Sequence, residues 1–377
     1  MSKRILFSLI GKETTPNYRA YKEFEPEVLV HIYSNETVGA SEILVSMVDK
    51  AKTKLILIEV DGDNYNDIIS KLNDFDFEIT KDDHVSINIT GGTKMMALAL
   101  VEFSKSIKNE NLDFFYIDWK QNIQWYLENK VEDFCDELEL DEFVKLKGQK
   151  IKSKDTFLIV FNKYENSINE IKEIIEDFGK RKQWDYFLES FVAKIRKSFK
   201  NPANKGESIY NLHKKWLIET ENKSLEVVWD TNSFKVFVKD VLFIELEQSI
   251  EEIEWFIFNA GWFELLTALK FSKKYEVNKI FMNVTFPVLK NVELDKNEVD
   301  ILINDGGKLI FVECKSGFVL PDAINSMKVR QETYGGQIGK SVLVTRYDLL
   351  KDKYDTAKVI LDKCHDLEIE IITYSKL

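Results

Sequence analysis

The chain has 377 residues, 44% of them hydrophobic, and a formal net charge of −12. This length predicts about two domains of roughly 100–200 residues each, and the hydrophobic content is too high for a disordered chain. The acidic balance argues against a protein that coats nucleic acid along its whole surface. The excess lies in residues 1–150, with 18 Lys and Arg against 28 Asp and Glu, whereas the remaining residues are close to neutral.

Several other classes of protein are also disfavoured. No apolar stretch approaches the roughly 20 residues of a membrane span, so we expect no membrane partner. The first apolar run is short and lacks the cleavage site of a signal peptide, which indicates a first strand. The three cysteines have no paired spacing and the four histidines form no ligand motif. This pattern favours a cytoplasmic protein and argues against a cysteine or histidine zinc site.

The first part of the chain alternates short apolar runs with helical patterns. We predict strands at residues 5–10, 28–33, 55–60, 85–90 and 113–118, with helices at 39–52, 65–72 and 94–108. This alternation is typical of an α/β, Rossmann-like domain with a doubly wound parallel sheet. An acidic run at residues 132–142 ends the pattern. We therefore predict domains at residues 1–148 and 149–377.

The second part predicts another α/β domain, with a mostly helical connecting region at 149–225 and a core at 226–377. The predicted elements are strands at 225–229 and 234–246, a helix at 250–273, a strand at 279–286, a hairpin at 298–315, a helix at 321–334, a strand at 341–345, a helix at 347–363 and a strand at 367–373. Residues 180–205 carry eight Lys and Arg against two acids. This stretch is either a nucleic-acid contact or a solvated helix face.

A glycine turn, Ile89-Thr-Gly-Gly-Thr-Lys94, follows the fourth predicted strand. Its glycines let the backbone approach a ligand, and the helix behind them presents free N–H groups and a positive dipole end. An anion, most simply a phosphate, is the expected ligand, although a tight turn without a ligand is the ordinary alternative. Polar loops after the first and second strands would emerge at the same edge of the sheet.

This arrangement resembles the CARF domain, the Rossmann-like sensor of CRISPR-associated ancillary proteins. The resemblance covers about residues 1–140 and implies a homodimer that binds a cyclic oligoadenylate between its subunits. The implied ligand contacts come from the three loops: Ile10, Gly11, Thr14, Pro16, Asn17, Ser34, Asn35, Thr90, Gly91, Gly92, Thr93 and Lys94.

A second group of residues lies in the predicted hairpin around Asp305-Gly306-Gly307. A turn at 305–306 places Asp300 opposite Phe311, whereas a turn at 306–307 places it opposite Glu313. Because side chains alternate along a strand, Asp300, Glu313 and Lys315 share one face in either register. Glu298 joins them if the strand is regular to that point.

Paired carboxylates in an apolar hairpin are unfavourable unless something compensates their charge. A Mg²⁺ or Mn²⁺ ion, which prefers oxygen ligands and can activate a water, would do so. The alternative is a solvent-facing side of an antiparallel pair. Glu264 argues for the ion, because it stands alone in the apolar helical stretch 259–270.

Residues 260–317 together resemble the PD-(D/E)xK nuclease superfamily, although Val299 replaces the proline of the motif name. The resemblance implies that Glu264 is the helix acid, that Asp300 and Glu313 bind the metal with it, and that Lys315 is the catalytic lysine. The backbone carbonyl of Cys314 is a further possible metal ligand. Candidates for contacts to the substrate backbone are Glu298, Lys328 and Arg330.

The two resemblances predict a type III CRISPR ancillary nuclease. It would be a homodimer that cyclic oligoadenylate, above all cyclic tetra-adenylate, activates to cleave DNA and, as in some members of the family, single-stranded RNA, with Mn²⁺ or Mg²⁺. Two alternatives stay open at this point. One is a ligand-responsive regulator that binds nucleic acid without cutting it, and the other is a ring nuclease that degrades its own cyclic ligand.

Overall fold

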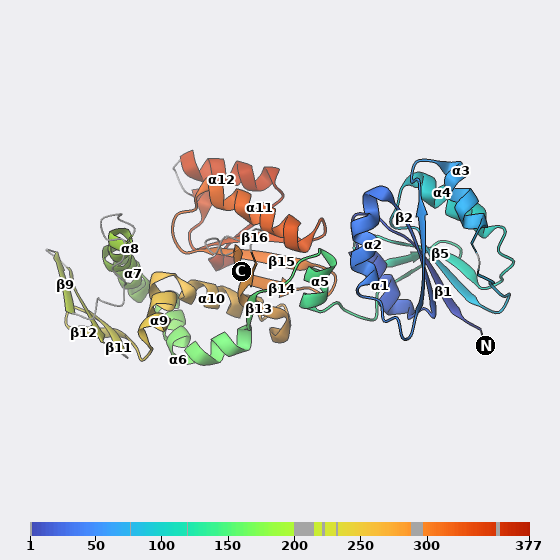
Figure 1. Ribbon diagram of the computed structural model, residues 1–377. Coiled ribbons are helices and arrows are strands. Elements are labelled where there is room, and N and C mark those ends of the chain that lie inside the picture. Colours follow the sequence, from blue (N-terminus) through green and yellow to red (C-terminus); the bar gives the residue numbers. More distant parts are fainter. Residues whose placement is uncertain are drawn as a thin grey trace.

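The computed structural model describes residues 2–75, 77–118, 120–199, 215–220, 223–230, 233–287, 297–351 and 355–377. Lys200 and Lys205 of the basic stretch, and residues 352–354 of an expected helix, lie outside these ranges. Figure 1 shows two α/β domains side by side, with a small separate sheet at the far end of the second domain. In the described part of the chain, no helix is both long and apolar enough to cross a membrane.

The N-terminal sheet has seven strands in the order β3-β2-β1-β4-β5-β6-β7. Its first five strands are parallel, which confirms the predicted doubly wound sheet: β1 (Arg4–Leu9), β2 (Val28–Ser34), β3 (Lys54–Val60), β4 (His84–Asn88) and β5 (Leu112–Ile117). The hairpin of β6 (Ile123–Trp125) and β7 (Lys130–Glu132) extends it antiparallel. The strand order reverses between β1 and β4, where ligands bind in such sheets.

Helices cover both faces of this sheet. α3 (Tyr65–Asn73) and α4 (Lys94–Ser104) pack on one face, whereas α1 (Thr15–Phe24) lies on the other, with α2 (Val38–Val45) beside it. The sequence pattern did not predict α1, because residues 8–18 were expected to form a polar loop. Pro16 in the first turn of α1 is the signal that could have revealed it, since the fixed φ of proline suits the start of a helix.

The second sheet has six strands in the order β17-β16-β15-β14-β13-β8. In chain order these are β8 (Ser153–Thr156), β13 (Ile280–Phe286), β14 (Asn297–Asn304), β15 (Leu309–Lys315), β16 (Lys340–Thr345) and β17 (Glu370–Thr373). α6 (Phe157–Glu176) and α10 (Gly261–Phe271) pack on one face, and α11 (Pro321–Gly335) and α12 (Asp355–Asp366) on the other (Figure 1). Residues 153–156, expected in the connecting region, therefore contribute an edge strand.

Between these elements the chain forms further helices and a separate antiparallel sheet. α7 (Phe178–Phe187) continues through the π-helical segment Leu188–Val192 into α8 (Ala193–Phe199). The sheet follows, with β9 (Lys215–Thr220), β10 (Lys223–Asp230), β11 (Ser233–Val238) and β12 (Val241–Leu246). The run 234–246 was expected to be one strand. It divides at Lys239 and Asp240, whose φ values of 53° and 61° form a tight hairpin turn.

A continuous apolar core joins the two domains at α5 (Leu140–Leu146). It combines Ile10 and Tyr18 of the first domain with Phe281, Val299 and Phe311 of the second. Two polar contacts reinforce the junction: the Thr14 hydroxyl donates to the Leu146 carbonyl oxygen at 2.6 Å, and Lys147 pairs with Glu13. These two contacts fix the loop after β1 to the segment that leads into the second domain.

Candidate active site

Glu264 enters the second domain's site because the helix before it is broken. The chain forms α9 (Ile250–Ile253) and then the π-helical segment Glu254–Phe258. Ala260 follows, and its φ of 66° redirects the chain into α10. Gly261 follows, and a Cβ there would collide with the ring of Trp255. The expected single helix at 250–273 is thus two, and Glu264 lies in the first turn of the second one.

β14 and β15 pair in the register of the Gly306-Gly307 turn, with Ile301 opposite Val312. Asp300 lies beyond the last pair of this ladder. Its Oδ2 accepts a hydrogen bond from the Cys314 N–H at 2.7 Å. The pairing of β14 with β13, its neighbour on the other side, is also irregular, because Asn283 of β13 has a φ of 51°.

This irregularity changes which side chains face α10. Ile301 and Ile303 pack in the core beside α10, whereas Val299 and Leu302 pack in the core beside α5 and α11. The alternation of β14 therefore shifts at Asp300. As a result, Asp300 and Glu298 line a cavity together with Glu264.

The cavity has a volume of about 490 Å³. Its lining residues are Arg196, Trp255, Asn259, Ala260, Glu264, Glu298, Asp300, Cys314, Lys315, Ser316, Gly317 and Phe318. The structure thus brings together five of the expected residues: Glu264, Glu298, Asp300, Cys314 and Lys315. The sequence pattern did not assign Trp255, Asn259 or Phe318 to the site, and it left Arg196 ambiguous within the basic stretch.

Glu313 lies beside this cavity and does not line it. Its side chain is turned toward α11, where Arg330 donates to Oε2 at 2.6 Å. Lys315 Nζ donates to the other carboxylate oxygen, Oε1, at 2.6 Å. The parity argument placed Asp300 and Glu313 on one face, and it failed because it assumed a regular strand at Asp300. Lys315 still connects the two acids, since it lines the cavity and also pairs with Glu313.

Burial dominates the electrostatics of the cavity. It raises the pKa of Asp300 to about 7, and the charge of Glu313 adds to this effect. It also raises the pKa of Glu264, with further contributions from Asp300 and Glu298. For Lys315, burial acts to lower the pKa, but the charges of Glu313 and Asp300 outweigh it and leave the pKa raised. The site therefore holds a firmly cationic lysine beside acids that resist ionisation.

The donor set suits a hard cation only in part. Glu264 and Asp300 offer carboxylate oxygens, but within the described ranges no three His, Cys, Asp or Glu side chains are grouped to hold a metal ion. Glu313, the third expected acid, is held by two cations instead. Burial and the neighbouring acids raise the pKa of the Cys314 thiol, so its carbonyl oxygen is the better donor for such an ion.

The two basic candidates of α11 lie in different places. Arg330 is next to the cavity through its pair with Glu313. Lys328 is 3.7 Å from Glu332 and lines a cavity at the junction between the domains. The structure therefore does not bring Lys328 to the acidic cavity.

The first domain places two of the expected loops in backbone contact at the carboxyl ends of β1 and β4. A Cβ at Gly91 would collide with the Leu9 carbonyl oxygen, and a Cβ at Gly11 would lie 3.4 Å from Gly91. Thr93 caps α4 by accepting from the Met96 N–H at 3.2 Å. The free N–H groups at the start of α4 and the exposed Lys94 therefore lie together at this edge.

The other expected ligand residues divide by burial. Ile10, Thr14, Pro16 and Asn17 are buried, and Asn17 Nδ2 donates to the Leu9 carbonyl oxygen at 2.9 Å. The Ser34 hydroxyl donates to Glu36 at 2.7 Å, and the Thr90 hydroxyl to Asn88 at 2.6 Å. Asn35 is exposed. The accessible part of this edge is thus formed by Gly11, Asn35 and residues 90–94.

Comparison with known proteins agrees with this architecture. Residues 5–143 match the family model of the Card1 CARF domain. Can2 from Sulfobacillus thermosulfidooxidans, solved with cyclic tetra-adenylate, is 17% identical with a TM-score of 0.60, covering 98% of this chain and 95% of Can2. Protein VC1899 from Vibrio cholerae is 14% identical with a TM-score of 0.63, covering 99% of this chain and 94% of that one.

A third solved structure is a type III CRISPR defence DNA nuclease activated by cyclic oligoadenylate. It is 14% identical with a TM-score of 0.52, and the match covers 92% of this chain but 45% of that one. No curated protein matches the chain. At identities this low, the structural matches establish a shared fold and nothing beyond it. The chain therefore contains a CARF domain at residues 5–143 and shares the fold of Can2 along its length.

Proposed function

We propose that this protein is a metal-dependent nuclease of type III CRISPR defence that cyclic oligoadenylate switches on. The observation that carries the proposal is one cavity containing Glu264, Asp300 and Lys315, with Glu313 hydrogen-bonded to that lysine. These residues come from one helix, α10, and two adjacent strands, β14 and β15. Their order along the chain is that of the PD-(D/E)xK pattern, and the cavity is open enough for a phosphodiester.

Glu264 and Asp300 would hold Mn²⁺ or Mg²⁺, with Glu313 and the Cys314 carbonyl completing the ligands. When bound, such an ion polarises a phosphoryl oxygen and lowers the pKa of a water molecule. Lys315 remains cationic because its pKa is raised. Its ammonium group can therefore donate a hydrogen bond to a phosphate oxygen or to the attacking water. Glu313 keeps Lys315 Nζ in place while the substrate enters.

The first domain would sense the activator. We assign cyclic oligoadenylate, with cyclic tetra-adenylate as the first choice, to the edge formed by Gly11, Asn35 and residues 90–94. The ligand seen with Can2 supports this choice of ring, and free N–H groups at a helix N-terminus suit its phosphates. A homodimer is supported by an exposed apolar stripe on α4: Met95, Leu98 and Val101 are 38%, 61% and 37% exposed.

A nuclease assay tests the proposal directly. Single-stranded DNA, single-stranded RNA and plasmid DNA are incubated with Mn²⁺ or Mg²⁺, with and without cyclic tetra-adenylate. We expect cleavage that needs both metal and activator. Glu313→Gln and Lys315→Met should each abolish it, whereas the control Glu370→Gln, an exposed acid on β17, should not. Cleavage that survives in both site variants would refute the assignment.

One observation favours a second function, a regulator that binds nucleic acid without cutting it. Glu313 is already neutralised by Lys315 and Arg330, and no three-ligand group is arranged in the described residues. Isothermal titration with Mn²⁺ separates the two functions. The nuclease requires a saturable site that Asp300→Asn removes, whereas the regulator predicts no such site.

A further inference from the structure

A second, apolar cavity of about 340 Å³ adjoins the acidic cavity. The two cavities share five lining residues: Arg196, Ala260, Ser316, Gly317 and Phe318. They are therefore neighbouring compartments of one depression. A ligand with its reacting group in the acidic cavity would therefore extend into the apolar cavity.

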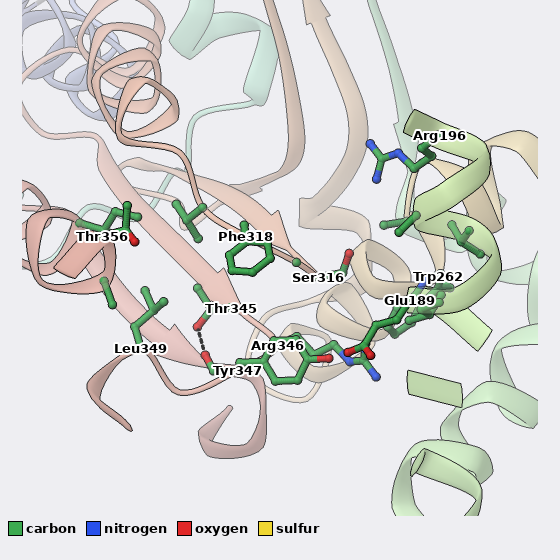
Figure 2. Close-up of a pocket in the computed structure, with 18 of the residues that line it drawn as sticks. Glu189, Arg196, Trp262, Ser316, Phe318, Thr345, Arg346, Tyr347, Leu349 and Thr356 are labelled. Atoms are coloured by element: carbon green, nitrogen blue, oxygen red, sulfur yellow. Dashed lines mark hydrogen bonds between the residues drawn. The ribbon is translucent and has the colours of Figure 1, made fainter. Parts of the chain in front are cut away.

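The walls of the apolar cavity come from regions that are distant in sequence. Leu188 and Val192 lie on the π-helical segment and Trp262 on α10, whereas the segments after β15 and β16 supply Phe318 and Tyr347. Figure 2 shows the ring of Phe318 near the centre of the drawn residues, with Arg196 on one side and Tyr347 on another.

Two aromatic rings of this cavity are accessible to solvent. Phe318 is 89% exposed and Tyr347 is 50% exposed. The Phe318 ring is not buried by the fold although it borders an apolar cavity, and apolar cavities with a few polar groups at their rim are typical ligand sites. These two rings can instead be covered by a planar ligand group.

The charged residues that line the cavity are Glu189, Arg196 and Arg346, and the two arginines differ in how they are engaged. Arg346 pairs with Asp185, and its guanidinium lies 5.3 Å and 5.1 Å from the ring centres of Trp262 and Tyr347. This arginine is committed to the wall. Arg196 is exposed and makes no ion pair among the residues that the structure describes. It lines both compartments, so it can meet an anionic group between them.

We propose that the apolar cavity binds the base of an unpaired nucleotide adjacent to the phosphate in the acidic cavity. The inference rests on the proposed nuclease function and adds to it the residues that select the substrate. A base stacks on aromatic rings irrespective of its sequence, and the volume lies in the range of small-molecule sites. Arg196 would contact the backbone phosphate between the two compartments.

This assignment makes single-stranded nucleic acid, DNA or RNA, the preferred substrate. In a duplex the base is stacked and paired, and it must be unstacked and unpaired before it can enter the cavity. Phe318 and Tyr347 are thus specificity-determining residues. They contact the substrate away from the scissile bond, so their loss should weaken binding without disabling the metal site.

The first test measures stacking and does not depend on cleavage. Single-stranded DNA and RNA oligonucleotides of the same sequence, each containing 2-aminopurine, are added to the Asp300→Asn protein with Mn²⁺ and cyclic tetra-adenylate. We expect quenched 2-aminopurine fluorescence on binding. Phe318→Ala should remove the quenching and weaken binding by roughly 5- to 150-fold, the range for one base–aromatic stack.

Matched variants make the result specific. Tyr347→Leu should act like Phe318→Ala. Leu320→Ala is the control, since Leu320 is 69% exposed nearby but lines neither cavity. Quenching that is absent, or equal in the Phe318 and Leu320 variants, would overturn the inference. An effect in only the DNA arm or only the RNA arm supports it and identifies the sugar.

A cleavage assay with protein that retains Asp300 tests the base pocket separately from the proposed nuclease function. Cut sites are first mapped, and the nucleotides flanking the cut are then replaced by abasic residues. We expect the abasic strand to be cut poorly and Phe318→Ala to have no further effect on it. If the parent cuts well and Phe318→Ala has the same defect on both strands, the base pocket is wrong while the nuclease stands. If nothing is cut but quenching requires Phe318, the pocket stands and the nuclease is wrong.

Discussion

Arg330 on α11 donates to Glu313 Oε2 on β15 at 2.6 Å, and the same helix borders the junction between the domains. Gln331 of α11 lines the junction cavity together with Lys12 and Thr14 of the first domain. α11 thus borders the same cavity as the loop after β1 and contacts the acid that the nuclease would need. A displacement of α11 would reach Glu313 through a single hydrogen-bonded pair.

Removing that pair should free Glu313 for a metal ion. In Arg330→Met we expect Mn²⁺ to bind about fivefold more tightly. Arg330 competes with the metal ion for Glu313, and removal of this competition should favour metal binding by about 1 kcal/mol. Titration calorimetry without activator measures the change. Lys340→Met, an exposed lysine at the start of β16, controls for net charge. Weaker Mn²⁺ binding in Arg330→Met would show that Arg330 supports the metal site.

Asp300→Asn should abolish metal-dependent cleavage and leave the fold intact. Burial raises the pKa of Asp300 to about 7, so the folded protein disfavours the charge that this substitution removes. We expect a thermal midpoint in EDTA at neutral pH that is at least that of the parent. A cleavage rate within tenfold of the parent would contradict the role of Asp300. A lower midpoint in EDTA would contradict the account of its burial.

The acidic site was partly predictable from sequence because spacing along a strand fixes which residues are close. The turn and the apolar pattern predicted the hairpin but left two registers open, and the grouping of Glu264, Asp300 and Lys315 came from the resemblance to the nuclease superfamily. The separation of Asp300 from Glu313 could not be predicted, since it depends on the shift in alternation at Asp300, opposite an Asn283 with positive φ. Asparagine tolerates that conformation, but nothing in its neighbours signals it.

The first domain shows the same division between local and tertiary information. The parallel strands were found because their apolar runs are continuous, which is typical of a sheet covered on both faces. α1 was missed because its polar residues resemble a loop, and tertiary packing buries Asn17 and Arg19. The wall residues Phe318 and Tyr347 could not be grouped from sequence, since they follow different strands and meet only in the fold.

Gly91 should be indispensable for ligand binding in the CARF domain. A Cβ at Gly91 would collide with the backbone oxygen of Leu9, which cannot move without displacing β1. Gly91→Ala should therefore lose cyclic tetra-adenylate binding in calorimetry and lower the thermal midpoint. Gly39→Ala is the control, because a Cβ there meets nothing within 4 Å and alanine favours a helix by roughly 1 kcal/mol. Normal ligand binding by Gly91→Ala would place the ligand elsewhere.

Leu98→Asp should dissociate the proposed homodimer. Leu98 is 61% exposed at the centre of the α4 stripe, between Met95 and Val101. A buried, unpaired carboxylate in such an interface costs several kcal/mol, so the dimer dissociation constant should rise by at least tenfold. Sedimentation analysis over a range of concentrations measures it. Leu350→Asp, at 72% exposure in the second domain, should leave the dimer unchanged. Equal effects of the two variants would move the interface away from α4.

His31 should make the protein sensitive to mild acid. It is 2% exposed on β2, and burial lowers its pKa from 6.5 to about 4. Because the folded pKa is depressed, its contribution to stability is complete above pH 6.5 and falls as the pH drops toward 4. At pH 5 the protonation of His31 in the unfolded state lowers the free energy of unfolding by about 2 kcal/mol. Thermal unfolding at pH 8 and pH 5 should therefore show a smaller loss for His31→Gln than for the parent. His365→Gln, whose side chain is 90% exposed, should behave like the parent, and an equal acid response of all three proteins would exclude His31 as the cause.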